Sequence, residues 1–270
     1  MTATDDLVCI ECIAQLTRYQ TGLLPDDDTE VVDEHLAGCP DCRLFSEQLD
    51  ATRDFLGDLP APDLPESLSA FEHSSDAVMA GLYRLANRID PDNASDLVQT
   101  TLLAALETGD GSLDLPTLAR NLVAAAGANP EPTIGSLQQT DDKVDSEDPD
   151  ADTAELFYPD FYADGPDAGR FVDAPVAWGE RQVLRPDDDV VATELFGIVD
   201  DALDGFPSPL GELVALVDID GLSVESAAET IGLSIDDAVD GLHRARVHLR
   251  ELLAMRTRAG AVTSTRDPRT

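Results

Sequence analysis

Four cysteines and one histidine near the N-terminus have the types and spacing of a metal site. The cysteines form two C-x2-C pairs, Cys9 with Cys12 and Cys39 with Cys42, and His35 precedes the second pair by four positions. Zinc takes four nitrogen or sulfur ligands in a tetrahedron with bonds of about 2.0–2.3 Å. In a chain without secretory features, clustered cysteines indicate metal or redox chemistry before structural disulfides. The sequence therefore predicts a zinc site here.

The residues around this cluster predict two helices that meet at the site. His35 falls late in a helical stretch that Gly38 can end. Pro40 suits the first position of a following helix, with Cys39 as its cap. Cys39 and Cys42 would then face the positive end of a helix, which lowers a thiol pKa and favours the thiolate that metals bind.

The stretch from residue 9 to 43 resembles the zinc-binding anti-sigma domain, in its H-x3-C-x2-C core and the Gly-x-Leu turn before it. That family has its upstream cysteine 26 positions before the histidine, which is the distance from Cys9 to His35. The resemblance implies Cys9, His35, Cys39 and Cys42 as ligands and leaves Cys12 as an extra thiol. Two alternatives stay open: the two cysteine pairs hold the zinc and His35 stands aside, or Cys12 is a redox thiol beside the site.

Composition favours small helical units and opposes nucleic-acid binding. The 270 residues are 43% hydrophobic but only 5% aromatic, and 55 acidic against 17 basic residues give a net charge of -38. Such a charge repels nucleic acid at long range. From His243 onward seven arginines and two acids leave a net of +5, so the rest of the chain carries -43.

The ends and the hydropathy of the chain predict a cytoplasmic protein without a membrane span. Residues 1–6 are acidic and lack the basic start of a signal peptide. No run of about 18 apolar residues is present.

Residues 74–127 resemble region 2 of extracytoplasmic-function sigma factors. In that family a D-L-V-Q helix helps to hold core RNA polymerase and an I-A-R-N helix helps to melt the promoter. Residues 119–121 match the second helix, but the family's preceding tryptophan is absent and residues 124–127 replace its basic positions with Ala-Ala-Ala-Gly. The resemblance therefore implies polymerase docking more than melting, through Asp96, Leu97, Val98 and Gln99.

Residues 204–253 resemble sigma region 4, which reads the -35 promoter element, and local signals independently predict a helix-turn-helix. Ser223 can cap a helix running to Ile231, Gly232 makes the turn, and Ser234 caps the next helix in a capping box with Asp237. The second helix of such a motif enters the major groove by its N-terminal residues. Its expected buried stripe is Val239, Leu242, Ala245, Leu249 and Leu252.

The expected recognition helix departs from the family in charge. Asp236, Asp237, Asp240 and Gly241 stand where the family has basic residues, and carboxylates repel phosphates. Positive charge begins only at Arg244 and Arg246. These two arginines would contact the DNA backbone or polymerase, or stabilise the end of the helix. The candidate DNA-binding residues are Ser234, Asp240, His243, Arg244 and Arg246.

The prediction is therefore an all-α chain with a small zinc-binding domain and two sigma-like helical domains joined by a long acidic linker. Six aromatic residues in that linker form a partner-binding motif or dock onto neighbouring helices. The expected parts are 1–57 (zinc-binding), 58–73 (linker), 74–127 (region 2-like), 128–189 (acidic linker), 190–255 (region 4-like) and 256–270 (basic tail).

The expected function is a transcription initiation regulator that binds core RNA polymerase, and promoter DNA only with polymerase, under control of its own zinc domain. The alternative is an anti-sigma or decoy protein that has lost promoter recognition, with another sigma or anti-sigma factor as a further partner. No nucleophile motif or phosphate loop is present, and four protein ligands leave no open position on the zinc, so we expect no enzymatic activity.

Overall fold

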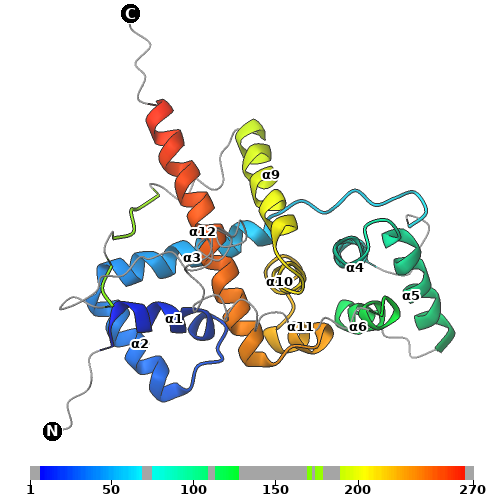
Figure 1. The fold of residues 1–270 in the computed structure, drawn as a ribbon, viewed down its shortest axis with the longest axis horizontal. Helices are drawn as coiled ribbons and strands as arrows, with labels where there is room; N and C mark the ends of the chain where they lie inside the picture. The colour runs from blue at the N-terminus through cyan, green and yellow to red at the C-terminus, as the bar shows by residue number, and fades with distance from the viewer. Residues whose placement is uncertain are drawn as a thin grey trace, which may run out of the picture. The chain divides into compact units, whose positions relative to one another are not determined.

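The computed structural model describes residues 7–68, 75–108, 113–127, 169–171, 174–178 and 189–264 (Figure 1). Every regular element within these ranges is a helix, which confirms the all-α prediction. None of the described helices is long and apolar enough to cross a membrane. The helices are α1 (Cys9–Gln20), α2 (Asp26–Gly38), α3 (Pro40–Gly57), α4 (Asp76–Ile89), α5 (Ala94–Thr108), α6 (Leu115–Ala125), α9 (Asp189–Gly205), α10 (Leu210–Val214), the π-helix η4 (Ala215–Ile219), α11 (Val224–Ile231) and α12 (Ile235–Ser264).

The chain divides into two compact units. The first unit comprises Met1–Phe55, Lys143–Val199 and His243–Thr270, and the second comprises Leu56–Asp142 and Asp200–Leu242. This grouping differs from the three separate helical parts expected from the sequence. The helix-turn-helix groups with α4–α6, whereas α12 from His243 onward groups with the cysteine-rich helices.

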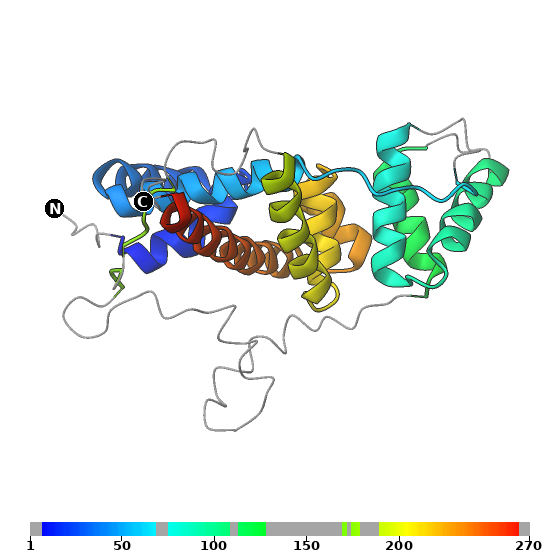
Figure 2. The same cartoon turned by 90° about the horizontal axis from the view of Figure 1, so that it is seen from above.

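The first unit is built on a core between α1, α2 and α3. Leu16, Val32 and Leu49 are fully buried there, and Val247 of α12 belongs to the same cluster. In Figure 1 α12 crosses α3 at a steep angle, and Figure 2 shows the two helices next to each other. Phe171 stacks on Phe45 at 6.0 Å between ring centroids, so this linker aromatic docks onto a helix. The linker residues 157–162 lie outside the described ranges.

The second unit packs the apolar faces of α4, α5 and α6 against one another. Leu82, Val98 and Leu118 are fully buried in it. Two of these helices begin at the caps that polar residues supply: Ser75 Oγ accepts from the backbone of Val78 before α4, and Asp114 caps α6 in the same way.

The helix-turn-helix has the caps expected from the sequence. Ser223 Oγ accepts the amide of Ser226, and Gly232 adopts a left-handed conformation with φ 76°. Ser234 Oγ accepts the amide of Asp237 at 3.1 Å and donates to the Asp237 carboxylate at 2.7 Å. The predicted motif is thus confirmed at the level of local structure.

The long helix α12 differs from the sequence prediction in its length and in one core position. It continues to Ser264, so part of the expected basic tail is helical. Leu253 is fully buried, whereas Leu252 is only half-buried. Arg256 forms an ion pair with Glu194 of α9 at 2.7 Å.

Candidate metal centre

Three thiols and one imidazole converge where α1, α2 and α3 meet. The ligand atoms of Cys9, His35, Cys39 and Cys42 all lie within 4.8 Å of one another. The sulfurs of Cys9 and Cys39 are 3.9 Å apart, and His35 Nε2 lies 3.2 Å from Cys42 Sγ. A tetrahedron with zinc–sulfur bonds of about 2.3 Å has sulfur–sulfur edges of about 3.8 Å. The four atoms therefore lie near the separations that a zinc ion needs, and the widest exceeds the tetrahedral edge by at most about 1 Å.

The turn between α2 and α3 positions three of these ligands. The amide of Cys39 donates to the carbonyl of His35 at 2.7 Å as α2 ends at Gly38, and α3 begins at Pro40. The predicted helix end and helix start are both confirmed. Cys42 falls in the first turn of α3, where the exposed backbone amides favour a negatively charged sulfur.

The pKa values of Cys9 and Cys42 are raised while no cation is near them, so the lowered pKa that the start of α3 predicts for Cys42 is not found. Burial raises the pKa of Cys9, and the neighbouring Cys39 raises it further. Contact with Cys12 and burial raise the pKa of Cys42. A divalent cation reverses this effect, since it stabilises the thiolates that otherwise repel one another. The donor set is consistent with zinc, which such N/S ligands prefer.

Cys12 lies beside the site but outside the group of four. Its side chain is fully buried in the core of the first unit, and contact with Cys42 lowers the pKa of its thiol. The structure thus brings together the ligand set implied by the resemblance, with His35 included. A redox role of Cys12 stays a prediction.

Residues 9–43 match the family model described as a putative zinc-finger, a type typical of anti-sigma factors. The match covers the complete group of four ligands and ends at Arg43. Comparisons with curated proteins and with solved structures gave no match. This segment is therefore similar to the zinc-fingers that are typical of anti-sigma factors.

The candidate DNA-binding side chains are largely buried in the first unit or engaged in capping. Arg246 is fully buried and Arg244 is 9% exposed. His243 Nδ1 lies 3.2 Å from Thr17 Oγ1, and Ser234 is the cap of α12. Asp240 is half-buried. Contact of these residues with DNA stays a prediction. Arg244 and Arg246 would have to become exposed before they could contact it.

The residues expected to bind polymerase lie on α5 with different exposures. Asp96 is exposed, Leu97 and Gln99 are half-buried, and Val98 is a fully buried core residue. Val98 therefore stabilises the helix bundle, and a partner would meet its neighbours. Leu103 and Leu106 further along α5 sit at helical spacing in the sequence, and the structure shows them exposed at 53% and 49%.

Zinc content distinguishes the ligand sets. We expect Cys39→Ser to lose most of the bound zinc, because it removes one of four ligands, whereas Cys12→Ala retains it. Metal analysis of protein purified without added zinc measures both. Loss of zinc in Cys12→Ala together with full retention in a His35→Ala variant would instead establish the arrangement of two cysteine pairs.

We expect the buried His243 to lower the free energy of unfolding in mild acid. Burial, together with the charge of Arg246, lowers its pKa from 6.5 to about 4. Between about pH 6.5 and pH 4, His243 is protonated in the unfolded chain and neutral in the folded chain. The free energy of unfolding therefore falls as the pH drops through this range. From pH 7.5 to 5.5 the expected loss is about 1.4 kcal/mol.

Denaturant unfolding of the intact protein and of His243→Gln at both pH values checks this expectation. The difference between the two proteins isolates His243 from the zinc ligands, which also bind protons in acid. An equal pH dependence in both proteins would show that His243 is not responsible.

Proposed function

We propose that the chain is a regulator of transcription initiation in which an anti-sigma-type zinc module holds back the basic part of a helix-turn-helix. The module is residues 7–56, and the basic part is α12 from His243 onward. The proposal extends the zinc-finger match to the helices that follow it, which resemble sigma regions 2 and 4 in sequence.

The observation that carries the proposal is the packing of Arg250 against the zinc module. Its Nε donates to Gln48 Oε1 at 2.9 Å, and its guanidinium lies 4.0 Å above the ring of Phe45. Both partners belong to α3, the helix that begins at the metal site. A buried guanidinium bonded and stacked in this way is unavailable to a phosphate.

Two further observations on the same face of α12 support this interpretation. Thr17 of α1 contacts His243, and the side chain of Arg246 is fully buried. His243 and Arg250 of α12 thus contact the zinc module, and Arg246, which lies between them, is buried. A module that lost its metal would lose the fold that holds these contacts, because structural zinc couples binding to folding.

A decoy protein is the second candidate, and the charge of the recognition helix favours it. Asp236 is exposed in the first turn of α12, where a DNA-reading helix needs donors. In this alternative the helical body binds polymerase or another sigma factor and never reaches a promoter.

The first candidate needs a polymerase-binding surface, and so does a decoy that binds polymerase. We propose the exposed side of α5 for this surface. Asp96 and Gln99 share this side with Leu103 and Leu106, because they recur at helical spacing. On this side of α5 a partner can contact both a charged group, Asp96, and the apolar surface of Leu103 and Leu106.

A pull-down with core RNA polymerase tests the proposed surface. We expect Asp96→Arg and Leu106→Glu each to weaken binding about tenfold, as for central interface residues. Asn87→Glu, at an exposed position of α4 in the same unit, is the matched control and should bind normally. Undiminished binding of both α5 variants would refute the assignment.

A further inference from the structure

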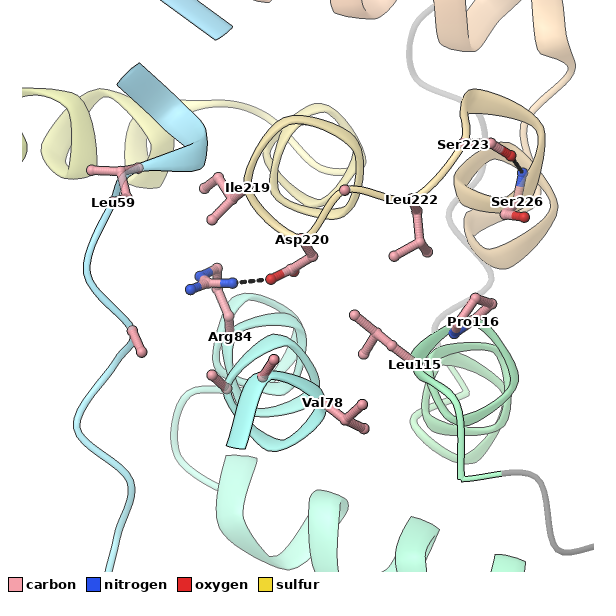
Figure 3. A pocket seen from close by; sticks show the side chains of 14 residues that line it. Leu59, Val78, Arg84, Leu115, Pro116, Ile219, Asp220, Leu222, Ser223 and Ser226 are labelled. Atoms are coloured by element: carbon pink, nitrogen blue, oxygen red, sulfur yellow. Dashed lines mark hydrogen bonds and ion pairs between the residues drawn. The ribbon is translucent and has the colours of Figure 1, made fainter. Parts of the chain in front are cut away.

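The second unit contains a cavity that the proposed function does not use. It has a volume of about 560 Å³ and lies among α4, α6, η4 and α11, with the chain before α4 on one side (Figure 3). This is the size of a small-molecule site. Most of its walls are apolar and come from Leu59, Val78, Leu115, Ile219 and Leu222.

One ion pair interrupts the apolar walls. Arg84 Nη1 donates to Asp220 Oδ1, and the side chains are only 14% and 7% exposed. Figure 3 shows both groups at the cavity, from α4 and from the end of η4. The second oxygen of the carboxylate, Asp220 Oδ2, is buried and has no hydrogen-bond partner. An acceptor left in this state costs about 1–3 kcal/mol unless another group donates to it.

The backbone that presents Asp220 is unusual. Ala215–Ile219 form a π-helix, and the amide of Asp220 reaches back to the carbonyl of Ala215 at 2.9 Å. Single π-helical turns are rare and are frequent at functional sites. On the facing helix, a Cβ at Gly81 would come within 2.8 Å of Leu115 and 3.1 Å of the Asp220 carboxyl carbon. The close approach of α4 to Asp220 therefore leaves little room for a side chain at this position.

We infer that the cavity binds a small, uncharged, mainly apolar molecule that carries a hydroxyl group. The apolar walls bury its hydrocarbon part, and a small rotation of the Asp220 carboxylate lets the hydroxyl donate to it. A neutral molecule fits because Arg84 and Asp220 already neutralise each other. An anion would meet the carboxylate, and a cation would meet the guanidinium. The inference is independent of the proposed role in transcription.

Three fluorescent probes that share the naphthalene ring system test the inferred binding. The protein used is the full chain loaded with zinc. The probes are 2-naphthol, naphthalene and 2-naphthoate, which differ in the donor and the charge that they bring. Equilibrium dialysis, read by the fluorescence of the probe, gives each affinity. We expect 2-naphthol to bind once per chain, naphthalene about tenfold more weakly for want of the hydrogen bond, and 2-naphthoate not to bind measurably.

Variants that fill the cavity locate the binding. Ser226→Trp on α11 and Ala77→Trp on α4 should both abolish binding of 2-naphthol, since both positions line the cavity. Glu225→Trp, exposed on the same helix as Ser226, should bind normally. If one filling variant fails to fold, as judged by circular dichroism, the other decides. Absence of 2-naphthol binding, equal affinity for naphthalene, or binding that survives in a folded filling variant would overturn the inference.

Discussion

Removal of zinc by a chelator is expected to unfold residues 7–56 while α4, α5 and α6 stay folded. Apparent binding free energies of structural zinc sites are about 10–16 kcal/mol. A module of this length has only about 3–8 kcal/mol of stability at the usual free energy per residue. The metal therefore contributes more than the rest of the module can replace, and its loss should be decisive.

Hydrogen exchange resolved along the chain measures this effect. Amides of α1, α2 and α3 should lose protection on chelation, and so should α12 around Val247, which shares their core. Amides of the second unit provide the internal control, because that unit is compact without the site. Added zinc should restore the protection and added magnesium should not. Metal-free protein with full helicity would contradict the expectation.

The full-length chain alone is expected to bind promoter DNA no more tightly than an ordinary nonspecific complex, with a dissociation constant of about 10⁻⁴ M or weaker in physiological salt. The chain carries -38 overall, and Arg246 and Arg250 are buried. Even if released, Arg244, Arg246 and Arg250 could neutralise about three phosphates, which gives a shallow salt dependence. Core polymerase would have to supply the missing attraction.

Fluorescence anisotropy of labelled promoter DNA at low and moderate salt measures this affinity. Arg43→Ala is a useful comparison, since this exposed arginine lies outside the helix-turn-helix and its loss should change the affinity little. Tight, specific binding without polymerase would show that the acidic body does not oppose DNA as electrostatics requires.

The local geometry of the metal site and of the helix-turn-helix was predictable because it depends on neighbours in sequence. Gly38, Cys39 and Pro40 end one helix and begin the next within three residues. Ser223, Gly232 and Ser234 act in the same way through caps and a left-handed turn. Each effect is decided by backbone chemistry within one turn, so no tertiary information is needed.

The environment of the basic residues on α12 was not predictable in this way. Arginine is usually a surface residue, so the sequence places Arg250 in solvent. In the structure it contacts Gln48 and Phe45, which lie about two hundred positions earlier. Val98 matches a motif implied to bind a partner, but its side of α5 turns out to be the core. The helical period cannot say which of two apolar sides is covered, and only packing decides between Leu102 and Leu103.

The central claim is that the zinc module restrains a sigma-like body, and promoter protection by core RNA polymerase tests it most directly. Genomic fragments would be incubated with polymerase and with the intact chain, Cys39→Ser, or Glu47→Gln, an exposed control on the helix that follows Cys39. Sequencing of the nuclease-protected fragments then identifies any specific site. The account predicts specific protection with Cys39→Ser, several-fold above that with the intact chain or Glu47→Gln. Equal protection by all three proteins would contradict restraint by zinc, and no protection by any of them would contradict the sigma-like role and favour the decoy.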